Sequence, residues 1–453
     1  MNNKAIPIVI ATDVNLERQA QVLIASILDS ADMNTEYTII VLVDEKVQRE
    51  KLREAFAECS NLNLNFHIIN EDLLNSTYLN LEGITAFTYA RLYIPSILKE
   101  YDKCLYLDVD VLVDGDLTAL LNWDIENYAV AGVKDGGAQY AYRERQISAD
   151  VVGGDESLEK YMNAGVLLMN LKKMRETGIA KQMIEMIGTP LLYQDQDIIN
   201  RCCCSSKLLL PTIYNFRAEY YRRKDAAKFN FYDQTDIEMM VGEPIIFHYA
   251  GGGLCRPWNF TKGRAAKLWW KIANKTLSAD EYKSLYAVAS KNELQMSICK
   301  MIEFCVSKKV VIWGYTKLAE KLCDMLLDQD INVICFGDNN DAKHDLVYEG
   351  VPVKSFCEIQ NDVDKEVCFI IASQKAYVEI EQFLHENGYK NTFHHKVKPK
   401  TYYIQLDEQF YEEEIKEIEW IERVPRENFD EQLIEKYCLY QWDLYNDGKT
   451  SKC

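Results

Sequence analysis

The sequence is poor in basic residues and has no long hydrophobic run. Its 453 residues include 51 Lys and Arg against 70 Asp and Glu, which gives a formal net charge of −19. General nucleic-acid binding is disfavoured because positive charge supplies most of its affinity, and binding to anionic membranes is disfavoured for the same reason. No apolar stretch approaches the roughly 20 residues that span a bilayer. The first residues, MNNKAIPIVIATDV, lack the apolar core and cleavage site of a secretory signal.

The cysteines lack a recognisable pattern. The chain has 14 of them, but without the dense spacing of a secreted disulfide scaffold, so a reducing compartment is favoured. Cys202, Cys203 and Cys204 are adjacent, with no C-x-x-C pair near them to complete a tetrahedral zinc site. We expect reduced thiols packed at the end of a helix, in a cytoplasmic protein. Peripheral association with the inner face of the cell membrane stays open.

What is present is an alternation of strands and helices in the first part of the chain. Residues 6–12, 37–45 and 64–70 (IPIVIAT, YTIIVLVDE and LNFHIIN) have the composition of strands, and helical periodicity occupies residues 16–31 and 46–59. This order predicts an α/β fold with a doubly wound, mostly parallel sheet. Ligands of such sheets bind beyond the carboxyl ends of the strands.

The length and the 48% hydrophobic content allow two or three domains with sizeable cores. After residue 270 the pattern becomes helical, and a new strand, KKVVIWG, begins at Lys308. The predicted parts are a first α/β domain over residues 1–275, a helical connector over 276–306, a smaller Rossmann-like α/β domain over 307–400 and an acidic helical tail over 401–453.

Two carboxylates stand one residue apart at the end of the apolar run KCLYLDVDVLV. In an extended chain, Asp108 and Asp110 would point to the same face and repel each other. Such oxygens are hard ligands suited to Mg²⁺ or Mn²⁺, usually shared with a phosphate, and a dication would relieve the repulsion. The alternative is a solvated pair at the end of a strand.

A second segment, EPIIFHYAGGGLCRPW, combines a histidine, a glycine-rich loop and a cation. His248 ends a strand-like stretch, and the amides of the following glycines, beginning at Gly251, could approach a phosphate closely. Arg256 could hold the same phosphate. The alternative here is a flexible hairpin loop with a structural histidine.

Further polar residues lie within apolar sequence, where their desolvation is costly unless they are used. Asn163 lies in YMNAGVLLMNL, and Asp195 and Gln196 lie in LLYQDQDIIN. Amides and carboxylates together suit sugar hydroxyls. Asp13 and Asn15 follow the first strand, where a nucleotide base would dock in a doubly wound sheet.

These segments resemble glycosyltransferase family 8, in the branch of galactosyl- and glucosyltransferases of bacterial surface polysaccharide synthesis. The resemblance covers residues 5 to about 270 and includes, in order, IATDVN, TAFTYARLYIP, YLDVDVLV, NAGVLLMNL, YQDQDIIN and HYAGG…RPW. It implies a GT-A fold, a UDP-hexose donor, Mn²⁺ (or Mg²⁺) and retention of the anomeric configuration. UDP-glucose and UDP-galactose both stay open, as does a carbohydrate, lipid-linked or protein acceptor.

The resemblance also implies roles for individual residues. The metal ligands would be Asp108, Asp110 and His248. The donor-binding set would comprise these three with Ala11, Asp13, Asn15, Arg91, Val109, Asn163, Asp195, Gln196, Gly251 and Arg256. The catalytic set would be Asp195, Gln196 and Arg256, the first two as partners of sugar hydroxyls. One departure is that the loop ends in Arg-Pro-Trp rather than Lys-Pro-Trp and has additional residues after the histidine.

The second domain carries an incomplete dinucleotide fingerprint. In VVIWGYTKLAE, Thr316 and Ala319 stand where the second and third glycines belong, and Asp338 lies where a ribose-binding acid would be. The region resembles small Rossmann-like domains appended to bacterial polysaccharide enzymes. A structural or assembly module, for example one forming a homo-oligomer, is favoured over NAD binding.

Two other functions compete with hexosyl transfer. One is a non-catalytic sugar-nucleotide-binding or scaffold protein of a polysaccharide pathway, and the other is an NAD-linked oxidoreductase that uses the second domain. A basic and aromatic segment at residues 216–229, FRAEYYRRKDAAKF, could contact an anionic or lipid-linked acceptor or could be a solvated helical face.

Overall fold

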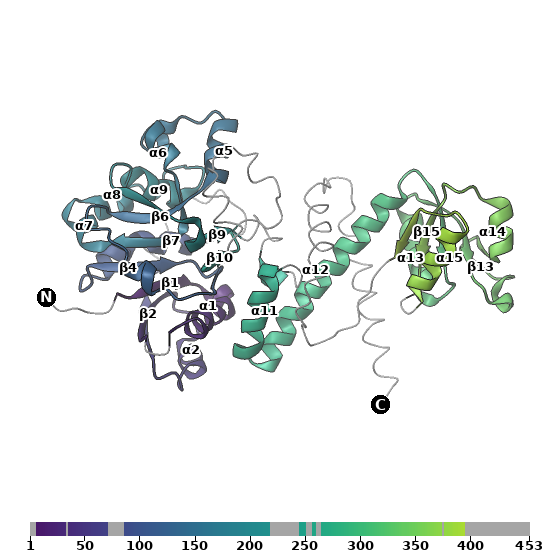
Figure 1. The fold of residues 1–453 in the computed structure, drawn as a ribbon, viewed down its shortest axis with the longest axis horizontal. Coiled ribbons are helices and arrows are strands. Elements are labelled where there is room, and N and C mark those ends of the chain that lie inside the picture. The colour runs from purple at the N-terminus through teal and green to yellow at the C-terminus, as the bar shows by residue number, and fades with distance from the viewer. Residues whose placement is uncertain are drawn as a thin grey trace. The chain divides into compact units, whose positions relative to one another are not determined.

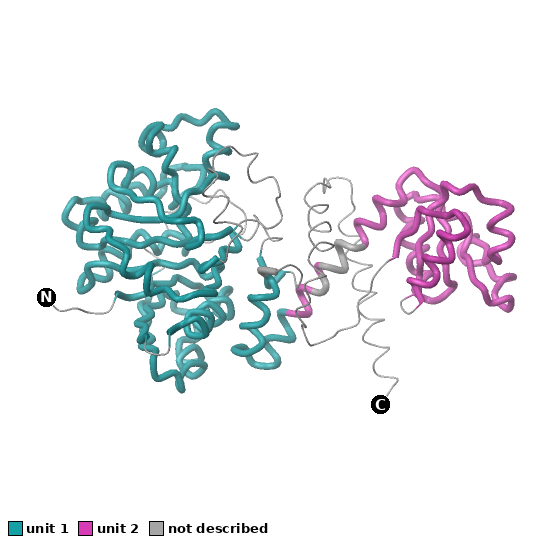
Figure 2. The backbone as a smooth tube through the Cα atoms, in the orientation of Figure 1, with its two compact units in different colours: residues 1–285, 407–419 teal, residues 286–406, 420–453 magenta. Residues whose placement is uncertain are grey.

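The structure, a computed structural model, describes residues 6–32, 35–70, 86–217, 244–250, 256–259, 264–373 and 376–394. These residues form two compact units, the first ending at Leu285 and the second beginning at Tyr286 (Figure 2). The expected tail and most of the basic segment, from residue 218 onward, lie outside the described residues. Within the described ranges, no helix has the length and apolar character needed to cross a bilayer.

The first unit is built on a seven-stranded sheet (Figure 1). Its strands are, in spatial order, β3 (Leu62–Ile68), β2 (Tyr37–Val43), β1 (Ile8–Thr12), β4 (Lys103–Leu107), β7 (Met162–Asn170), β6 (Val130–Lys134) and β8 (Lys207–Leu210). All neighbouring pairs are parallel except those of β7, which runs antiparallel to β4 and β6. The predicted α/β fold with a mostly parallel sheet is therefore confirmed.

Helices cover both faces of this sheet. In chain order, the helices of the first unit up to residue 202 are α1 (Glu17–Asp29), α2 (Arg49–Ala55), α3 (Ile94–Ile97), α4 (Thr118–Leu121), α5 (Gly136–Glu144), α6 (Asp155–Glu159), α7 (Leu171–Glu176), α8 (Ile179–Glu185) and α9 (Gln194–Cys202), of which α5 and α6 pack in a separate small cluster. Successive residues of β1 supply opposite cores: Ile8 packs with Leu23 of α1, and Val9 packs in the cluster that contains Met183 of α8 and Ile198 of α9. Two-sided burial explains why these strands are nearly continuous apolar runs.

A small three-stranded sheet is connected to the large one through the segment that follows β4. It comprises β5 (Val111–Val113), β10 (Ile246–His248) and β9 (Phe216–Arg217), in the order β5-β10-β9. The chain leaves β4 at Leu107 and enters β5 at Val111. Asp108 and Asp110 therefore lie in the turn that joins the two sheets. The acids follow the end of the strand CLYL, as expected, but they do not lie on one face of an extended chain, because the chain bends here to change sheets.

The end of the first unit is anchored by aromatic packing. Helix α11 (Arg264–Thr276) carries Trp270, whose Nε1 donates to the carbonyl of Pro257 at 2.9 Å. Tyr282, in helix α12 (Ala279–Cys305), packs edge-on against Trp270 with ring centroids 5.4 Å apart. The expected domain boundary at residue 275 thus falls inside this packing, which continues into the first turns of α12.

The second unit has its own six-stranded sheet. In spatial order its strands are β13 (Val347–Tyr348), β14 (Val351–Lys354), β12 (Asn332–Gly337), β11 (Lys309–Trp313), β15 (Cys368–Ile371) and β16 (Thr392–His394), and its helices after α12 are α13 (Lys317–Asp328), α14 (Phe356–Asp362) and α15 (Tyr377–Glu386). All pairs except β13–β14 are parallel. The strand order reverses at β11, as in doubly wound folds.

Candidate active site

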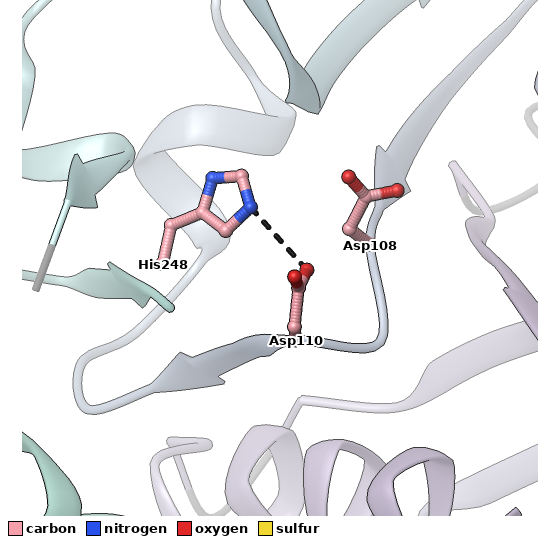
Figure 3. A group of neighbouring side chains, drawn as sticks. All are labelled: Asp108, Asp110 and His248. Atoms are coloured by element: carbon pink, nitrogen blue, oxygen red, sulfur yellow. Dashed lines mark ion pairs between the residues drawn. The ribbon is translucent and has the colours of Figure 1, made fainter. Parts of the chain in front are cut away.

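Three side chains converge where the two sheets meet. Asp108 and Asp110 come from the turn after β4, and His248 comes from the end of β10, which pairs antiparallel with β5. Each offers one ligand atom, and these atoms all lie within 4.8 Å of one another. Nε2 of His248 lies 3.3 Å from Oδ1 of Asp110, while Asp108 faces them from the end of β4 (Figure 3).

This group fits a divalent cation. Two carboxylates and one imidazole leave coordination positions open for the oxygens of a phosphate or of water, as hard cations such as Mn²⁺ and Mg²⁺ require. In the part of the chain that the structure describes, it is the one cluster of three or more His, Cys, Asp or Glu side chains with such convergence. The Cys202–Cys204 run does not form one, and all three thiols are free.

Gly165, on β7, leaves the space that the group occupies. A Cβ atom at this position would lie 2.2 Å from Cε1 of His248 and 2.9 Å from Oδ2 of Asp108. The carbonyl of Gly165 also accepts a hydrogen bond from the backbone N–H of Asp108 at 2.8 Å. Only a residue without a side chain allows β7 to approach both ligands this closely.

Arg91 neutralises the acids from the protein side. It lies in the 3-10 helix η3 (Ala86–Tyr93), 6% exposed, with Nη2 2.7 Å from Oδ1 of Asp108 and Nε 3.0 Å from Oδ2 of Asp195. Burial lowers the pKa of Arg91, but these two carboxylates raise it by more, so the guanidinium stays charged. Nη1 donates to the carbonyl of Ala164 at 2.7 Å and Nη2 to Oγ1 of Thr88 at 3.1 Å. Arg91 would therefore act on a donor through the acids that it holds.

Asp195 and Asp110 differ in their electrostatic environments. Burial raises the pKa of Asp195 to about 6, and Arg91 offsets only part of that effect. Burial also raises the pKa of Asp110, but a protonated His248 together with Arg256 lowers it by more, so with that histidine charged the pKa of Asp110 ends below its usual value. Asp195 follows Gln194, a non-glycine residue with a φ of 52° at the start of α9. Left-handed backbone at such a residue costs free energy and is frequent at functional sites.

A buried polar cluster adjoins these residues. Gln196 accepts the N–H of Ala164 at its Oε1 (2.9 Å), and its Nε2 donates to Oδ2 of Asp135 at 3.3 Å. Asn163 Nδ2 donates to the same carboxylate oxygen at 3.1 Å, and Arg217 Nη1 lies 2.9 Å from Oδ1. Burial raises the pKa of Asp135, but Arg217 and the amides lower it by more, so this carboxyl is ionised. Such a set of fixed amides and carboxylates suits sugar hydroxyls.

The expected uridine contacts lie at the carboxyl end of β1. Asp13 caps the 3-10 helix η1 (Val14–Leu16), accepting the N–H of Asn15 at 2.9 Å, and the side chain of Asn15 is exposed. Ala11 is the penultimate residue of β1. Since β1 pairs with β4, with Ile10 opposite Leu107, this strand end lies next to the one that leads to Asp108 (Figure 1).

Arg256 lies near enough to Asp110 to lower the pKa of that carboxyl. Its guanidinium carbon is 5.9 Å from the centre of the Trp258 ring, and its Nε is buried without a hydrogen-bond partner among the described residues. Gly251 lies outside the described residues. The side chain of Val109 belongs to the core, 6% exposed, so only its backbone could contact a donor.

Sequence reasoning missed three residues of this arrangement: Asp135, Gly165 and Asn215. Asp135 follows a strand and precedes two glycines, so its place at a strand end was a usable signal. Gly165 lies inside the motif NAGVLLMNL, but its role is to leave space for His248 and Asp108, which the sequence alone does not show to be its neighbours. Asn215, which bonds Nδ1 of His248 at 2.8 Å, carries no sequence signal, since the pair is formed by strand pairing alone.

In the second unit, the acid of the incomplete fingerprint is already engaged. Oδ2 of Asp338 accepts the N–H of Tyr315 at 2.8 Å and the ammonium of Lys343 at 2.8 Å, and Oδ1 accepts the N–H of Asn340 at 2.8 Å. Thr316 caps α13 through the N–H of Ala319 at 3.2 Å. A ribose hydroxyl would have to displace these contacts, which argues against a dinucleotide here.

Comparison with known proteins places these observations in a family. A sequence profile described as glycosyl transferase family 8 matches residues 7–262, and one described as C2185-like, N-terminal matches residues 306–392. The chain is 28% identical over 281 residues to glycosyltransferase GlyE of Streptococcus pneumoniae serotype 4, covering 60% of this chain and 62% of the relative. It is 26% identical to the lipopolysaccharide 1,2-glucosyltransferase of Escherichia coli K12, covering 54% of this chain and 70% of that relative.

A solved structure supports the fold assignment. The galactosyltransferase LgtC, determined with donor and acceptor sugar analogues, aligns with a TM-score of 0.51 and 26% identity, covering 62% of this chain and 100% of that one. The expected GT-A fold is thereby confirmed. The chain spans less than two thirds of the length of the GlyE relative.

Proposed function

The chain belongs to glycosyl transferase family 8, and from this premise we propose that it transfers a hexose, glucose or galactose, from a UDP-sugar to a glycan, glycolipid or protein acceptor. The observation that carries the proposal is the convergence of Asp108, Asp110 and His248 beside a buried cluster of amides and carboxylates. The similar proteins include a lipopolysaccharide glucosyltransferase and a galactosyltransferase, and these names agree with the proposal.

In this proposal the three converging side chains hold Mn²⁺ or Mg²⁺. When bound, the cation would offset the negative charge that grows on the leaving diphosphate. Arg256 would supply a second positive charge to that diphosphate. Two observations support this role: its buried Nε has no hydrogen-bond partner among the described residues, and it lowers the pKa of Asp110, a proposed metal ligand. Asp13 and Asn15 hold the uridine at the end of β1.

The donor sugar lies against the buried polar cluster. Asp195, Gln196 and Asn163 orient its hydroxyls, and Arg91 fixes Asp195 and Asp108 relative to each other. Gln196 is a poor nucleophile because its carbonyl oxygen already accepts the N–H of Ala164. Retention then follows from attack on the same face from which the diphosphate leaves, with a phosphate oxygen accepting the proton of the acceptor hydroxyl.

We assign donor chemistry to the first unit and acceptor use or assembly, including a homo-oligomer, to the second. Every proposed donor contact, from Ala11 to Arg256, lies before Leu285, where the first unit ends. In the second unit, Oδ2 of Asp338 already accepts hydrogen bonds from Tyr315 and Lys343. The proposal therefore assigns no second nucleotide to this unit.

The test measures donor binding and turnover on the full chain. Mn²⁺ together with UDP-glucose or UDP-galactose is expected to raise the melting temperature, and release of UDP is expected to depend on the cation. In Asp110→Asn the affinity for Mn²⁺ and UDP-sugar, obtained from the dependence of the melting temperature on ligand concentration, and the rate of UDP release should each fall at least about tenfold. Asp102→Asn is the matched control, because the side chain of Asp102 is 81% exposed.

The outcomes separate the competing functions. UDP-sugar binding without any hydrolysis or transfer would support the non-catalytic sugar-nucleotide-binding protein. If none of the UDP-hexoses shifts the melting temperature with Mn²⁺ present, the proposed donor class is wrong.

A further inference from the structure

His248 makes a different contact with each ring nitrogen. Nε2 faces Oδ1 of Asp110 at 3.3 Å, on the side where the carboxylates converge (Figure 3). Nδ1 faces Oδ1 of Asn215 at 2.8 Å. Both side chains are buried, with 3% of His248 and 2% of Asn215 exposed. A neutral imidazole carries its proton on one nitrogen and binds a metal through the other, so the partner of Nδ1 decides whether Nε2 is free.

The oxygen and nitrogen of an asparagine side chain are told apart by their partners. The backbone N–H of Gly165, which can only donate, lies 2.9 Å from Oδ1 of Asn163. The opposite end of Asn163 faces the carboxylate of Asp135, which accepts when ionised, at 3.1 Å. Asn163 therefore presents its oxygen to Asn215, whose Nδ2 donates to it at 2.9 Å.

This orientation fixes the histidine as well. Because Nδ2 of Asn215 donates to Asn163, the atom of Asn215 that faces the imidazole is its oxygen, which accepts from Nδ1–H. The lone pair of Nε2 then points toward the carboxylates. On the basis of the proposed metal-dependent function, we propose that Asn215 is a positioning residue that holds His248 in the Nδ1–H tautomer and keeps Nε2 available for the divalent cation.

The competing Nε2–H tautomer of His248 would hinder metal binding. With its proton on Nε2, His248 would donate to Asp110 across the 3.3 Å contact, and that hydrogen bond would engage two of the three ligands. Asn215 disfavours this tautomer, because the lone pairs of Nδ1 and of its own oxygen would then face each other at 2.8 Å. Asn163 also donates to Oε1 of Gln196 at 3.2 Å, so the same relay joins the metal ligand to the proposed sugar-binding groups.

A direct test reads the tautomer in the metal-free protein. Nitrogen-15 NMR of the full chain labelled at its six histidines, recorded at a pH high enough for imidazoles to be neutral, should give His248 with the proton on Nδ1, the signal being assigned with His248→Gln. A dominant Nε2–H signal in the wild type would overturn the proposal without any need for a variant at Asn215.

The variant test uses Asn215→Leu, which keeps the approximate volume but removes both hydrogen bonds. We expect the Nε2–H signal to increase and the affinity for Mn²⁺, measured by titration with UDP present, to fall 10- to 100-fold. Asn170→Leu is the matched control: it lies at the far end of β7, caps α7 through the N–H of Lys173, and should leave Mn²⁺ affinity unchanged. Wild-type affinity and an unchanged tautomer in Asn215→Leu would refute the positioning role.

Failure of the proposed function is distinguishable from failure of this inference. A wild-type protein that binds no Mn²⁺ would overturn the metal-dependent function and the metal-binding purpose of the relay. A wild type that binds Mn²⁺ with His248 in the Nε2–H tautomer would overturn the positioning role alone.

Discussion

Replacing Gly165 by Ala should disable the metal site with little change elsewhere in the first unit. The new Cβ would lie 2.2 Å from Cε1 of His248, whereas ordinary contacts begin near 3.4 Å, so the ring would have to move by about 1.2 Å, the difference between these distances. The imidazole cannot simply rotate away, because Nδ1 is bound to the buried Asn215 and its strand pairs with β5.

The expected magnitudes follow from that displacement. Overpacking of this kind costs about 1–3 kcal/mol, which corresponds to roughly 2–12 °C in melting temperature for a domain of this size. Displacing a metal ligand by more than 1 Å should lower Mn²⁺ affinity by at least about 100-fold, the upper end of what losing a supporting hydrogen bond costs. Mn²⁺ titration in the presence of UDP and thermal unfolding measure the two effects separately.

Gly132→Ala is the matched control. Gly132 pairs with β7 from β6, but the nearest atom to a Cβ there would be a flexible side-chain end, Cδ2 of Leu167 at 3.1 Å. Sδ of Met162 and the backbone oxygen of Val166 would both lie at the ordinary contact distance of 3.4 Å. We expect it to alter stability without altering Mn²⁺ affinity. If Gly165→Ala binds Mn²⁺ as tightly as the wild type, the geometry of the site given above is wrong.

Three other predictions can be checked independently. The first-formed glycoside should be α-linked when the donor is an α-linked UDP-hexose, and a β-linkage seen by NMR would contradict same-face attack. Burial lowers the pKa of Lys207 from 10.5 to about 8, so the folded state prefers the neutral amine, and stability should rise with pH between about 8 and 10.5 and be lost as pH falls through that window. Relative to Lys207→Met, the wild type should gain up to about 3 kcal/mol across this range in urea unfolding, and a flat difference would disprove the effect. A chain ending at residue 306 should retain Mn²⁺-dependent UDP-sugar hydrolysis. A chain ending at 275 loses the Trp270–Tyr282 contact and should melt at a lower temperature. Loss of donor binding in a well-folded 306-residue form would assign part of the site to the second unit.

Much of the fold was predictable because the strands carry periodic or continuous apolar patterns. The expected strand at 37–45 corresponds to β2 (Tyr37–Val43), and the helix at 16–31 to α1 (Glu17–Asp29). The reversed direction of β7 was not predictable: MNAGVLLMN is buried on both faces, so its side chains are compatible with either parallel or antiparallel neighbours.

The site was predictable where chemistry and motif coincide in one segment. A cation at Asp108 and Asp110 was expected from their spacing, whereas His248 was expected as the third ligand only through the family resemblance. The structure brings the three side chains together. A divalent cation was expected to offset the repulsion between the paired acids. The ion pair between Arg91 and Asp108, which needs no cation, was not expected. Asn215 could not be found, because its role depends on two other side chains whose proximity comes from pairing between distant strands.

The passage of the chain between the two sheets also constrains when the site can form. Asp108 and Asp110 are complete once β4 and β5 are made, but His248 arrives from β10, far along the chain, and only as that strand pairs with β5. During synthesis Asp108 and Asp110 would therefore be present before His248 is, and until then Arg91 would be the counter-ion of Asp108. A bound cation would link segments that are distant in sequence and so close a long loop of the chain. It should therefore slow the separation of β10 from β5 and stabilise the domain at a late stage of its folding.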